Sequence, residues 1–396
     1  MEKKNILIGI SGGIAAYKIT YLIRHYKKNN YNVKVIMTEN SLNFISKVTV
    51  ETLSENKVYV DSFEMDFTDK KDGFIPHIKL ADFADLFILA PATANVLGKI
   101  ANGIADDLLT STTIALKKDI PKLIFPAMNV KMLENSFTQK NISNLKKEGY
   151  KVFQTDEGEL ACGVIAKGRL PEPETIYNLT KRFLIPQKLK GKKILVTSGA
   201  TLEKIDPVRY ISNHSSGKMG VSIAEKCYES GAEVDIVSGK YSIDSYLDSQ
   251  IFVSSTEDMW EKVKKLFGKK KYDYVVMAAA VSDYSVNDYK KEKIKKNNET
   301  LTLKLNKNID IIKSINDNFK TKIIGFAAET SNLMENALKK LNEKKMYMIV
   351  ANDVTKKDTG FRSESNECII FKGSKKYETG KKKKTEIAKK IIELME

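Results

Sequence analysis

The sequence has few cysteines and no long hydrophobic run. Three cysteines in 396 residues cannot provide a disulfide framework, so we expect a reducing, cytoplasmic environment. No apolar run approaches the roughly 18 residues that a membrane-spanning helix requires, so no membrane partner is predicted. Residues 1–5 lead directly into an apolar run at 6–10, which is too short for a signal peptide. What remains is a globular chain whose length suits two domains.

The charge balance is strongly basic, with a formal net charge of +16. Lysine is spread over the whole chain, and no pattern of aromatic and basic residues for stacking on nucleic acid accompanies it. The densest run, 381–384, precedes a C-terminal helical pattern, and we interpret it as a solvated face. A nucleic-acid-binding protein is an alternative that charge alone suggests. We predict instead that the chain binds anionic small molecules and no nucleic acid.

Strand and helix patterns alternate along both halves, which predicts parallel sheets with crossover helices. Expected strands are 6–10, 33–37, 86–89, 123–125 and 151–153, and then 193–197, 234–237, 274–278, 323–327 and 348–351. The periodicity breaks near 171–173 and over 183–192, so we predict domains at 1–188 and 189–396. The fold class is α/β, with two doubly wound, mostly parallel-sheet domains, one flavodoxin-like and one Rossmann-like. Lysine-rich residues 289–298 are expected to form a mobile loop.

Neither of the common glycine motifs for nucleotides occurs, since both Gly-x-x-x-x-Gly-Lys-Ser/Thr and Gly-x-Gly-x-x-Gly are missing. Residues 210–220, Tyr-Ile-Ser-Asn-His-Ser-Ser-Gly-Lys-Met-Gly, nevertheless join an expected strand to an expected helix at 221. Free N–H groups at such a helix start bind anions, and Lys218 adds positive charge. This stretch therefore predicts an anion site, with an ordinary connecting loop as the alternative.

Small and polar residues also follow several strands of the first half. Residues 9–18 form a glycine-rich turn, which is equally typical of a tight turn and of a phosphate site. Thr38, residues 90–95 and residues 126–129 follow the next strands and should meet at the same sheet edge. This composition favours a flat ligand pressed against backbone.

The first half resembles the flavin-containing cysteine decarboxylases. It is most similar to the decarboxylase half of the bifunctional phosphopantothenoylcysteine decarboxylase/phosphopantothenate–cysteine ligases of coenzyme A biosynthesis. The matching motifs are Ser-Gly-Gly-Ile-Ala-Ala-Tyr at 11–17, His-Ile at 77–78, Pro-Ala-Thr-Ala-Asn at 91–95, Ala-Asp-Asp-Leu-Leu-Thr at 105–110, Pro-Ala-Met-Asn at 126–129 and Leu-Ala-Cys-Gly at 160–163. Their shared order and spacing make chance agreement improbable.

The resemblance implies an FMN-dependent decarboxylation. Residues implied to bind FMN are Ser11, Gly12, Gly13, Ile14 and Thr38 at the phosphate, and Pro91, Thr93 and Asn95 at the ring. His77 would be catalytic, Asn129 would position the substrate carboxylate and Cys162 would donate a proton. The substrate thiol would be oxidised to a thioaldehyde, lose its carboxylate and be reduced again with that proton.

Two of these residues have simpler interpretations, and one nearby position departs from the family pattern. A lone histidine such as His77 is by default a surface or core residue, and a lone cysteine such as Cys162 is a small buried hydrophobe. The family usually has glycine where this chain has Ala166. If that position needed a positive φ, alanine would be strained by ~1 kcal/mol.

The second half resembles the ligase half of the same family. Matching motifs are residues 198–209, 210–220, 278–284, 293–296, 307–311, 325–330 and 350–353. The implied reaction activates 4′-phosphopantothenate with a nucleoside triphosphate and couples it to cysteine. CTP is preferred over ATP by resemblance only, and Mg²⁺ is expected with it, its ligands being unknown.

The resemblance also assigns ligase residues. Asn213 would bind the acyl intermediate and Lys293 would neutralise the activated phosphate. The implied nucleotide site consists of Met277, Ala278, Ala279, Asp283, Lys293, Ile309, Asp310, Ile311, Ile312, Phe326, Lys340 and Lys344. A solvated lysine face is the alternative for Lys340 and Lys344, which are spaced to share one side of a helix. We also expect a homo-oligomer, and a flavin-storing scaffold with an inactive first site is the rival function.

Overall fold

The computed structural model describes residues 3–61, 75–159, 165–295, 300–355, 360 and 363–395. The chain divides into two compact units, Met1–Leu184 and Ile185–Glu396. Each unit is described by itself below. Cys162 and Lys296 lie outside the described residues.

The first unit contains a six-stranded parallel sheet with the strand order β3-β2-β1-β4-β5-β6. Its strands are β1 (Asn5–Ile10), β2 (Asn32–Met37), β3 (Val58–Tyr59), β4 (Leu86–Ala92), β5 (Lys122–Pro126) and β6 (Lys151–Val152). The order 3-2-1-4-5-6 is that of Rossmann sheets, whereas flavodoxin has the order 2-1-3-4-5. Both are doubly wound parallel sheets, and the predicted α/β fold class is confirmed.

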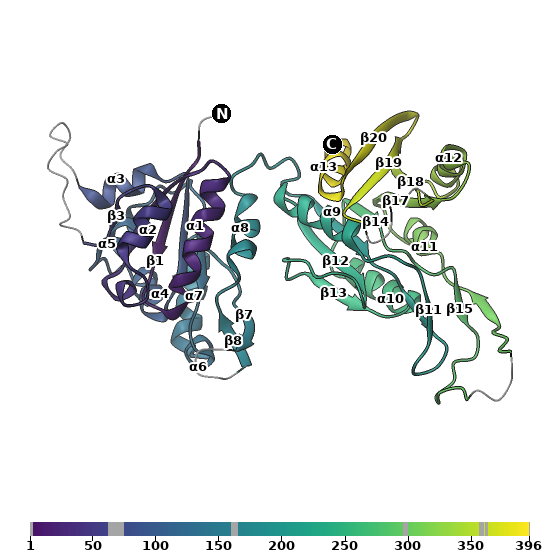
Figure 1. Cartoon of the computed structure of the whole chain (residues 1–396), viewed down its shortest axis with the longest axis horizontal. Coiled ribbons are helices and arrows are strands. Elements are labelled where there is room, and N and C mark those ends of the chain that lie inside the picture. Colours follow the sequence, from purple (N-terminus) through teal and green to yellow (C-terminus); the bar gives the residue numbers. More distant parts are fainter. Residues whose placement is uncertain are drawn as a thin grey trace. The chain divides into compact units, whose positions relative to one another are not determined.

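Helices cover both faces of this sheet because its strands alternate apolar side chains between two cores. Ile6 and Ile8 face one core and Leu7 the other. The first core packs against α1 (Ile19–Lys28), α2 (Lys47–Ser54) and α8 (Pro173–Lys181); the second packs against α3 (Pro76–Phe83), α4 (Ala94–Ala101), α5 (Leu108–Ala115) and α7 (Ser136–Lys147). Figure 1 shows α1 and α8 side by side along the sheet.

Short elements decorate the carboxyl edge of the sheet. They are η1 (Ile14–Lys18), η2 (Glu39–Asn43), α6 (Val130–Glu134) and the antiparallel hairpin of β7 (Asp156–Glu159) and β8 (Ile165–Arg169). Ala166 pairs with Gly158 in this hairpin and is not among the described residues with positive φ. The strain considered for alanine at this position is therefore not present. Gly168 has the positive φ of this strand, at 127°.

The second unit repeats the same order for six parallel strands and adds an antiparallel pair, giving β13-β12-β9-β14-β17-β18-β19-β20. These strands are β9 (Lys193–Ser198), β12 (Glu233–Gly239), β13 (Gln250–Val253), β14 (Tyr274–Met277), β17 (Lys322–Glu329), β18 (Met348–Asp353), β19 (Ser365–Lys372) and β20 (Lys375–Lys383). All ten predicted strands are found, whereas the antiparallel ones were not predicted. Two hairpins also extend from the carboxyl edge: β10 (Leu202–Lys204) with β11 (Tyr210–Ser212), and β15 (Tyr284–Val286) with β16 (Leu305–Lys307).

Five helices complete the second unit as it is described: α9 (Lys218–Glu229), α10 (Thr256–Phe267), α11 (Ile311–Asn318), α12 (Leu333–Glu343) and α13 (Lys384–Met395). The core between the sheet and α10 and α11 is separate from the one beneath α12. Figure 1 shows α9 beside α13. The run 381–384 is not the uniformly solvated face that was predicted, because Lys384 begins α13 and is only 6% exposed.

Gly239 at the end of β12 permits a close approach of backbone. A Cβ at this position would lie 1.9 Å from the carbonyl oxygen of Ala200. We predict that Gly239→Ala destabilises the second unit by about 1–3 kcal/mol, because the backbone must shift. Urea titration measures the free energy of unfolding of this unit when it is followed by the fluorescence of Trp260, the one tryptophan of the sequence. Gly268→Ala is the control, since its Cβ would meet nothing closer than 3.5 Å. Equal midpoints for the two variants would contradict the prediction.

Candidate active sites of the two units

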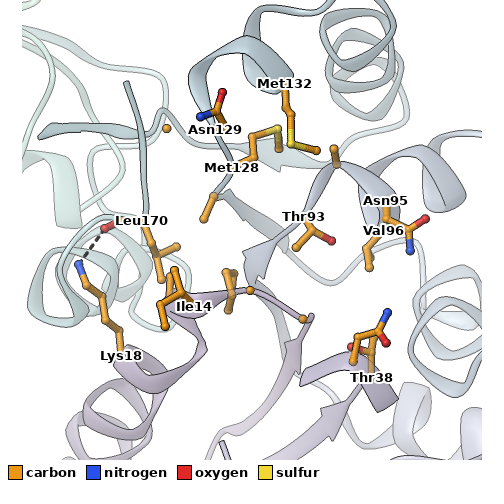
Figure 2. Close-up of a pocket in the computed structure, with 18 of the residues that line it drawn as sticks. Ile14, Lys18, Thr38, Thr93, Asn95, Val96, Met128, Asn129, Met132 and Leu170 are labelled. Atoms are coloured by element: carbon orange, nitrogen blue, oxygen red, sulfur yellow. Dashed lines mark hydrogen bonds between the residues drawn. The ribbon is translucent and has the colours of Figure 1, made fainter. Parts of the chain in front are cut away.

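The first unit has a cavity of about 1010 Å³ at the carboxyl ends of its strands. The loops after β1, β2, β4 and β5 line it, and the end of β8 closes one side (Figure 2). Its lining includes every predicted FMN-binding residue except Ser11, namely Gly12, Gly13, Ile14, Thr38, Pro91, Thr93 and Asn95, together with Asn129. The cavity lies where the chain reverses its winding direction between β1 and β4, which is where open α/β sheets bind ligands.

Ser11 lies beneath the cavity and connects two of its loops. Its hydroxyl donates to the carbonyl oxygen of Pro91 at 2.7 Å and accepts a hydrogen bond from the Thr93 backbone N–H at 3.1 Å. The side chain is fully buried and is not part of the cavity lining. Ser11 therefore orders the loops that follow β1 and β4, and these loops present the residues that line the cavity.

Thr38 gives the cavity wall an unpartnered hydroxyl group, and Gly12 allows two loops of the wall to approach closely. The Thr38 hydroxyl is buried and has no hydrogen-bond partner among the described residues. A buried polar group without a partner is costly, so a ligand atom that bonds it gains free energy. At Gly12 a Cβ would lie 2.8 Å from the carbonyl carbon of Asn40, so only glycine fits between this loop and η2.

Sequence reasoning missed several charged residues of this wall. Lys18 is 6% exposed, and its ammonium group donates to the Leu170 carbonyl at 3.2 Å and to Glu172 at 2.8 Å (Figure 2). Lys99 pairs with Asp106 at 2.8 Å and with Asp107 at 3.3 Å. The hydrogen bond to Asp106 is the main cause that raises the pKa of Lys99. The two aspartates belong to a motif noted in the sequence, but nothing there indicated that their partner lies on α4.

The three residues predicted to be catalytic in the first unit differ in their position relative to the cavity. Asn129 lines the cavity and caps α6, its side-chain oxygen accepting from the Lys131 N–H at 2.9 Å. Figure 2 shows the neighbouring Met128 and Met132 across the cavity from Ile14 and Thr38. His77 lies in the first turn of α3 and is not part of the cavity lining. Cys162 falls outside the described residues.

The second unit has a smaller cavity, of about 130 Å³, at the carboxyl ends of β9, β14, β17 and β18. The loop 215–219 of the predicted anion-binding motif forms one wall. Ala278, Ala279 and Phe326 of the predicted nucleotide site also line it. The lining residues that the sequence analysis did not assign to the site include Asn352, Asn366 and Lys384. Burial is the main cause that lowers the pKa of Lys384, and the charge of Lys218 lowers it further.

Asn213 joins the hairpin of β10 and β11 to the loop after β14. Its side-chain amide donates to the carbonyl oxygens of Ala280 at 3.1 Å and Val281 at 3.4 Å. Asp283 lies just beyond that loop with an exposed side chain, and its backbone carbonyl accepts from the Asn308 N–H at 2.8 Å. Asn213 and Asp283 therefore belong to one hydrogen-bonded group of loops.

The remaining predicted nucleotide residues differ in exposure. Ile311 packs in the core with Met277, Ile312 packs against that core, and Ile309 is 42% exposed. Lys340 pairs with Glu329 at 2.7 Å and Lys344 with Asp310 at 2.8 Å. Burial alone would raise the pKa of Asp310, but the hydrogen bond from Lys344 contributes to lowering it. Both lysines pair with carboxylates but remain partly exposed, so a solvated lysine face stays an alternative for them.

Lys293 is not part of the lining of the second cavity. The described residues of its loop, 289–295, form no helix or strand, and hydrogen bonds attach them to the turn between β10 and β11. Within the described ranges there is no group of three acidic, histidine or cysteine side chains that could hold a metal ion. No helix among those residues is long and apolar enough to cross a membrane.

Comparisons with known proteins agree on the family. Residues 1–185 match the family described as Flavoprotein, and residues 189–396 match the DNA/pantothenate metabolism flavoprotein C-terminal domain. The coenzyme A biosynthesis bifunctional protein CoaBC of Bacillus subtilis is 41% identical over 397 residues, covering 99% of this chain and 95% of that protein. The CoaBC protein of Escherichia coli is 37% identical over 375 residues, covering 93% and 90%.

A solved structure, the C-terminal domain of a CoaBC protein, is 37% identical to this chain. It covers 53% of this chain and 96% of its own length, with a TM-score of 0.45. The two family matches together extend over nearly the whole chain, and the relatives align along almost their full length. The chain therefore belongs to the family of bifunctional coenzyme A biosynthesis proteins CoaBC.

Proposed function

We propose that this bifunctional enzyme catalyses two consecutive steps of coenzyme A biosynthesis. The second unit joins cysteine to 4′-phosphopantothenate at the expense of CTP, and the first unit decarboxylates the product to 4′-phosphopantetheine with FMN. The observation that carries the proposal is the pair of cavities, one at the carboxyl edge of each sheet, within a chain of the CoaBC family. Each step thereby has a site of its own.

The first cavity fits a flavin mononucleotide in size and in polar groups. Its volume of about 1010 Å³ accommodates a cofactor-sized ligand. The FMN phosphate would be held by Gly12, Gly13 and the unpartnered hydroxyl of Thr38. The flavin ring would contact Thr93 and Asn95. When bound, FMN would take two electrons from the substrate and return them after carbon dioxide has left, so no external oxidant is needed.

The protein's own groups would then orient the substrate and move a proton. Asn129, which lines the cavity wall, would position the substrate carboxylate. Cys162 would donate the proton that completes the product, because a thiol can titrate near neutral pH. His77 would assist from the start of α3. These assignments rest on the motif matches.

In the ligase step, a carboxylate oxygen of 4′-phosphopantothenate bonds to the α-phosphorus of CTP, and pyrophosphate leaves. The amine of cysteine then displaces CMP and forms the amide. Lys293, Lys340 and Lys344 would neutralise the phosphates, and Asn213 would contact the acyl-cytidylate. Mg²⁺ would arrive with the triphosphate, as it usually keeps phosphate and water ligands and needs few protein groups.

We also propose that the enzyme works in the cytoplasm as a homo-oligomer. Ile14 and Tyr17 line the first cavity and are 60% and 51% exposed. Exposed apolar side chains around a site favour contact with another subunit. Sedimentation at micromolar concentration measures the assembly state.

The overall function is tested with the purified protein, FMN, 4′-phosphopantothenate, cysteine, CTP and Mg²⁺. Mass spectrometry should detect 4′-phosphopantothenoylcysteine first and 4′-phosphopantetheine after it. Replacing CTP with ATP tests the nucleotide preference. A protein that binds FMN and forms neither product would instead be the flavin-storing scaffold considered above.

Thr38 provides a sharper test of the FMN site. We predict that Thr38→Val weakens FMN binding by about tenfold, because a hydrogen bond to a charged phosphate is lost. The stability of the cofactor-free protein should change little, since the hydroxyl has no partner there. Thr112→Val is the matched control, as its hydroxyl is also buried without a partner but lies in α5 outside the cavity lining. Flavin fluorescence titrations and thermal melts measure both effects. Unchanged FMN affinity in Thr38→Val would remove Thr38 from the site.

Lys293 tests the assignment of the ligase step. We predict that Lys293→Gln slows acyl-cytidylate formation by about a hundredfold, because a charge-assisted contact to phosphate is lost. Decarboxylation of supplied 4′-phosphopantothenoylcysteine should stay at the wild-type rate. Lys295→Gln on the same loop is the control. Pyrophosphate release measures activation, and a wild-type rate in Lys293→Gln would show that this loop does not act in the step.

A further inference from the structure

One buried carboxylate anchors the loop that carries Lys293. Asp206 lies in the turn between β10 and β11, and its side chain is 0% exposed. One carboxylate oxygen accepts hydrogen bonds from the backbone N–H groups of Val208 and Arg209, both at 2.8 Å. The other oxygen accepts from the N–H of Ile294 at 3.2 Å. Asp206 thus closes its own turn and also holds a segment far along the chain.

Neighbouring groups reinforce this attachment. The guanidinium of Arg209 donates to the carbonyl oxygen of Ile294 at 2.9 Å, and the N–H of Lys290 donates to the carbonyl of Ile205 at 3.1 Å. Both backbone polar groups of Ile294 are therefore bonded to the turn. The peptide unit is planar, so fixing the N–H of Ile294 also fixes the plane that contains the Cα of Lys293.

The environment of Asp206 favours the charged form of its carboxylate. Burial acts to raise the pKa of Asp206, but the N–H groups of Val208, Arg209 and Ile294 and the charge of Arg209 lower it overall. A carboxylate that accepts several backbone N–H bonds favours its ionised form. The Lys293 side chain itself makes no hydrogen bond or ion pair within the described ranges, so the attachment orders its backbone and leaves its ammonium group to a ligand.

We propose that Asp206 is a positioning residue of the ligase reaction, which fixes Lys293 for activation of the nucleotide. This inference rests on the proposed function of the second unit. The same hairpin continues through β11 to Asn213, whose amide bonds the loop after β14. One short hairpin thereby sets the positions of the residue proposed for phosphate activation and of the residue proposed for the acyl intermediate.

A purely structural role for Asp206 in its own turn is the competing explanation. The variant Asp206→Asn distinguishes a role in the turn from a role in positioning Lys293. Asparagine keeps one oxygen for the N–H groups of Val208 and Arg209. The second oxygen becomes an NH₂ group, which can neither accept from the N–H of Ile294 nor pair with the Arg209 guanidinium 3.7 Å away. The turn is then retained while the attachment of the Lys293 loop is lost.

The decisive experiment is a double-mutant cycle on acyl-cytidylate formation, with wild type, Asp206→Asn, Lys293→Gln and the double variant. If Asp206 acts through Lys293, Asp206→Asn lowers kcat by about ten- to hundredfold in the wild-type background. In the Lys293→Gln background it should cost less than about threefold, because the effects of coupled residues do not add. Equal losses in both backgrounds, or a wild-type rate for Asp206→Asn, would overturn the proposal.

Controls separate this result from misfolding and from failure of the proposed function. Asp288→Asn breaks an exposed ion pair with Lys290 on the same loop and should leave kcat unchanged. Melting followed by Trp260 fluorescence verifies that the second unit is folded. If Asp206→Asn does not fold, Arg209→Met removes the hydrogen bond to the Ile294 carbonyl, because methionine has no N–H donor. It should show the same non-additivity with Lys293→Gln, and additive losses would again overturn the proposal. Wild-type protein that forms no acyl-cytidylate would refute the ligase function itself.

Discussion

Both candidate sites depend on hydrogen bonds that join the loop after the first strand of each parallel sheet to the loop after the fourth. In the first unit, Ser11 bonds the backbone of Pro91 and Thr93. In the second unit, the N–H of Ala280 donates to the carbonyl of Gly199 at 2.7 Å. Neighbouring strands separate at this point because the chain winds in opposite directions from it. These hydrogen bonds fix the two strand ends relative to each other, and the loops that continue from them line the cavities.

Lysine side chains held by carboxylates occur near the candidate sites of both units. The wall of the first cavity contains the buried, unpartnered hydroxyl of Thr38 and the ammonium group of Lys99, which pairs with Asp106. In the second unit, Lys340 and Lys344 are paired with carboxylates. If these lysines bind a nucleotide as proposed, its phosphates would compete with Glu329 and Asp310 for their ammonium groups.

The central strands could be predicted from sequence because they are apolar runs buried on both faces. The edge pair β19 and β20 could not, since β20 is an exposed, lysine-rich strand whose charges protect an open sheet edge. For this reason the run 381–384 was interpreted as solvated, although Lys384 is buried in the second cavity. Thr38 was predicted because strand ends meet at one edge. Lys18 was missed because its partner Glu172 lies 154 residues away, and no local pattern reveals such a pair.

The described residues that line the first cavity all precede Leu184, and those that line the second all follow Ile185. Each half therefore supplies the described lining of its own cavity. A gene cut at this junction would still encode both linings, one in each product. Because one chain carries both units, the two cavities are always made in equal numbers.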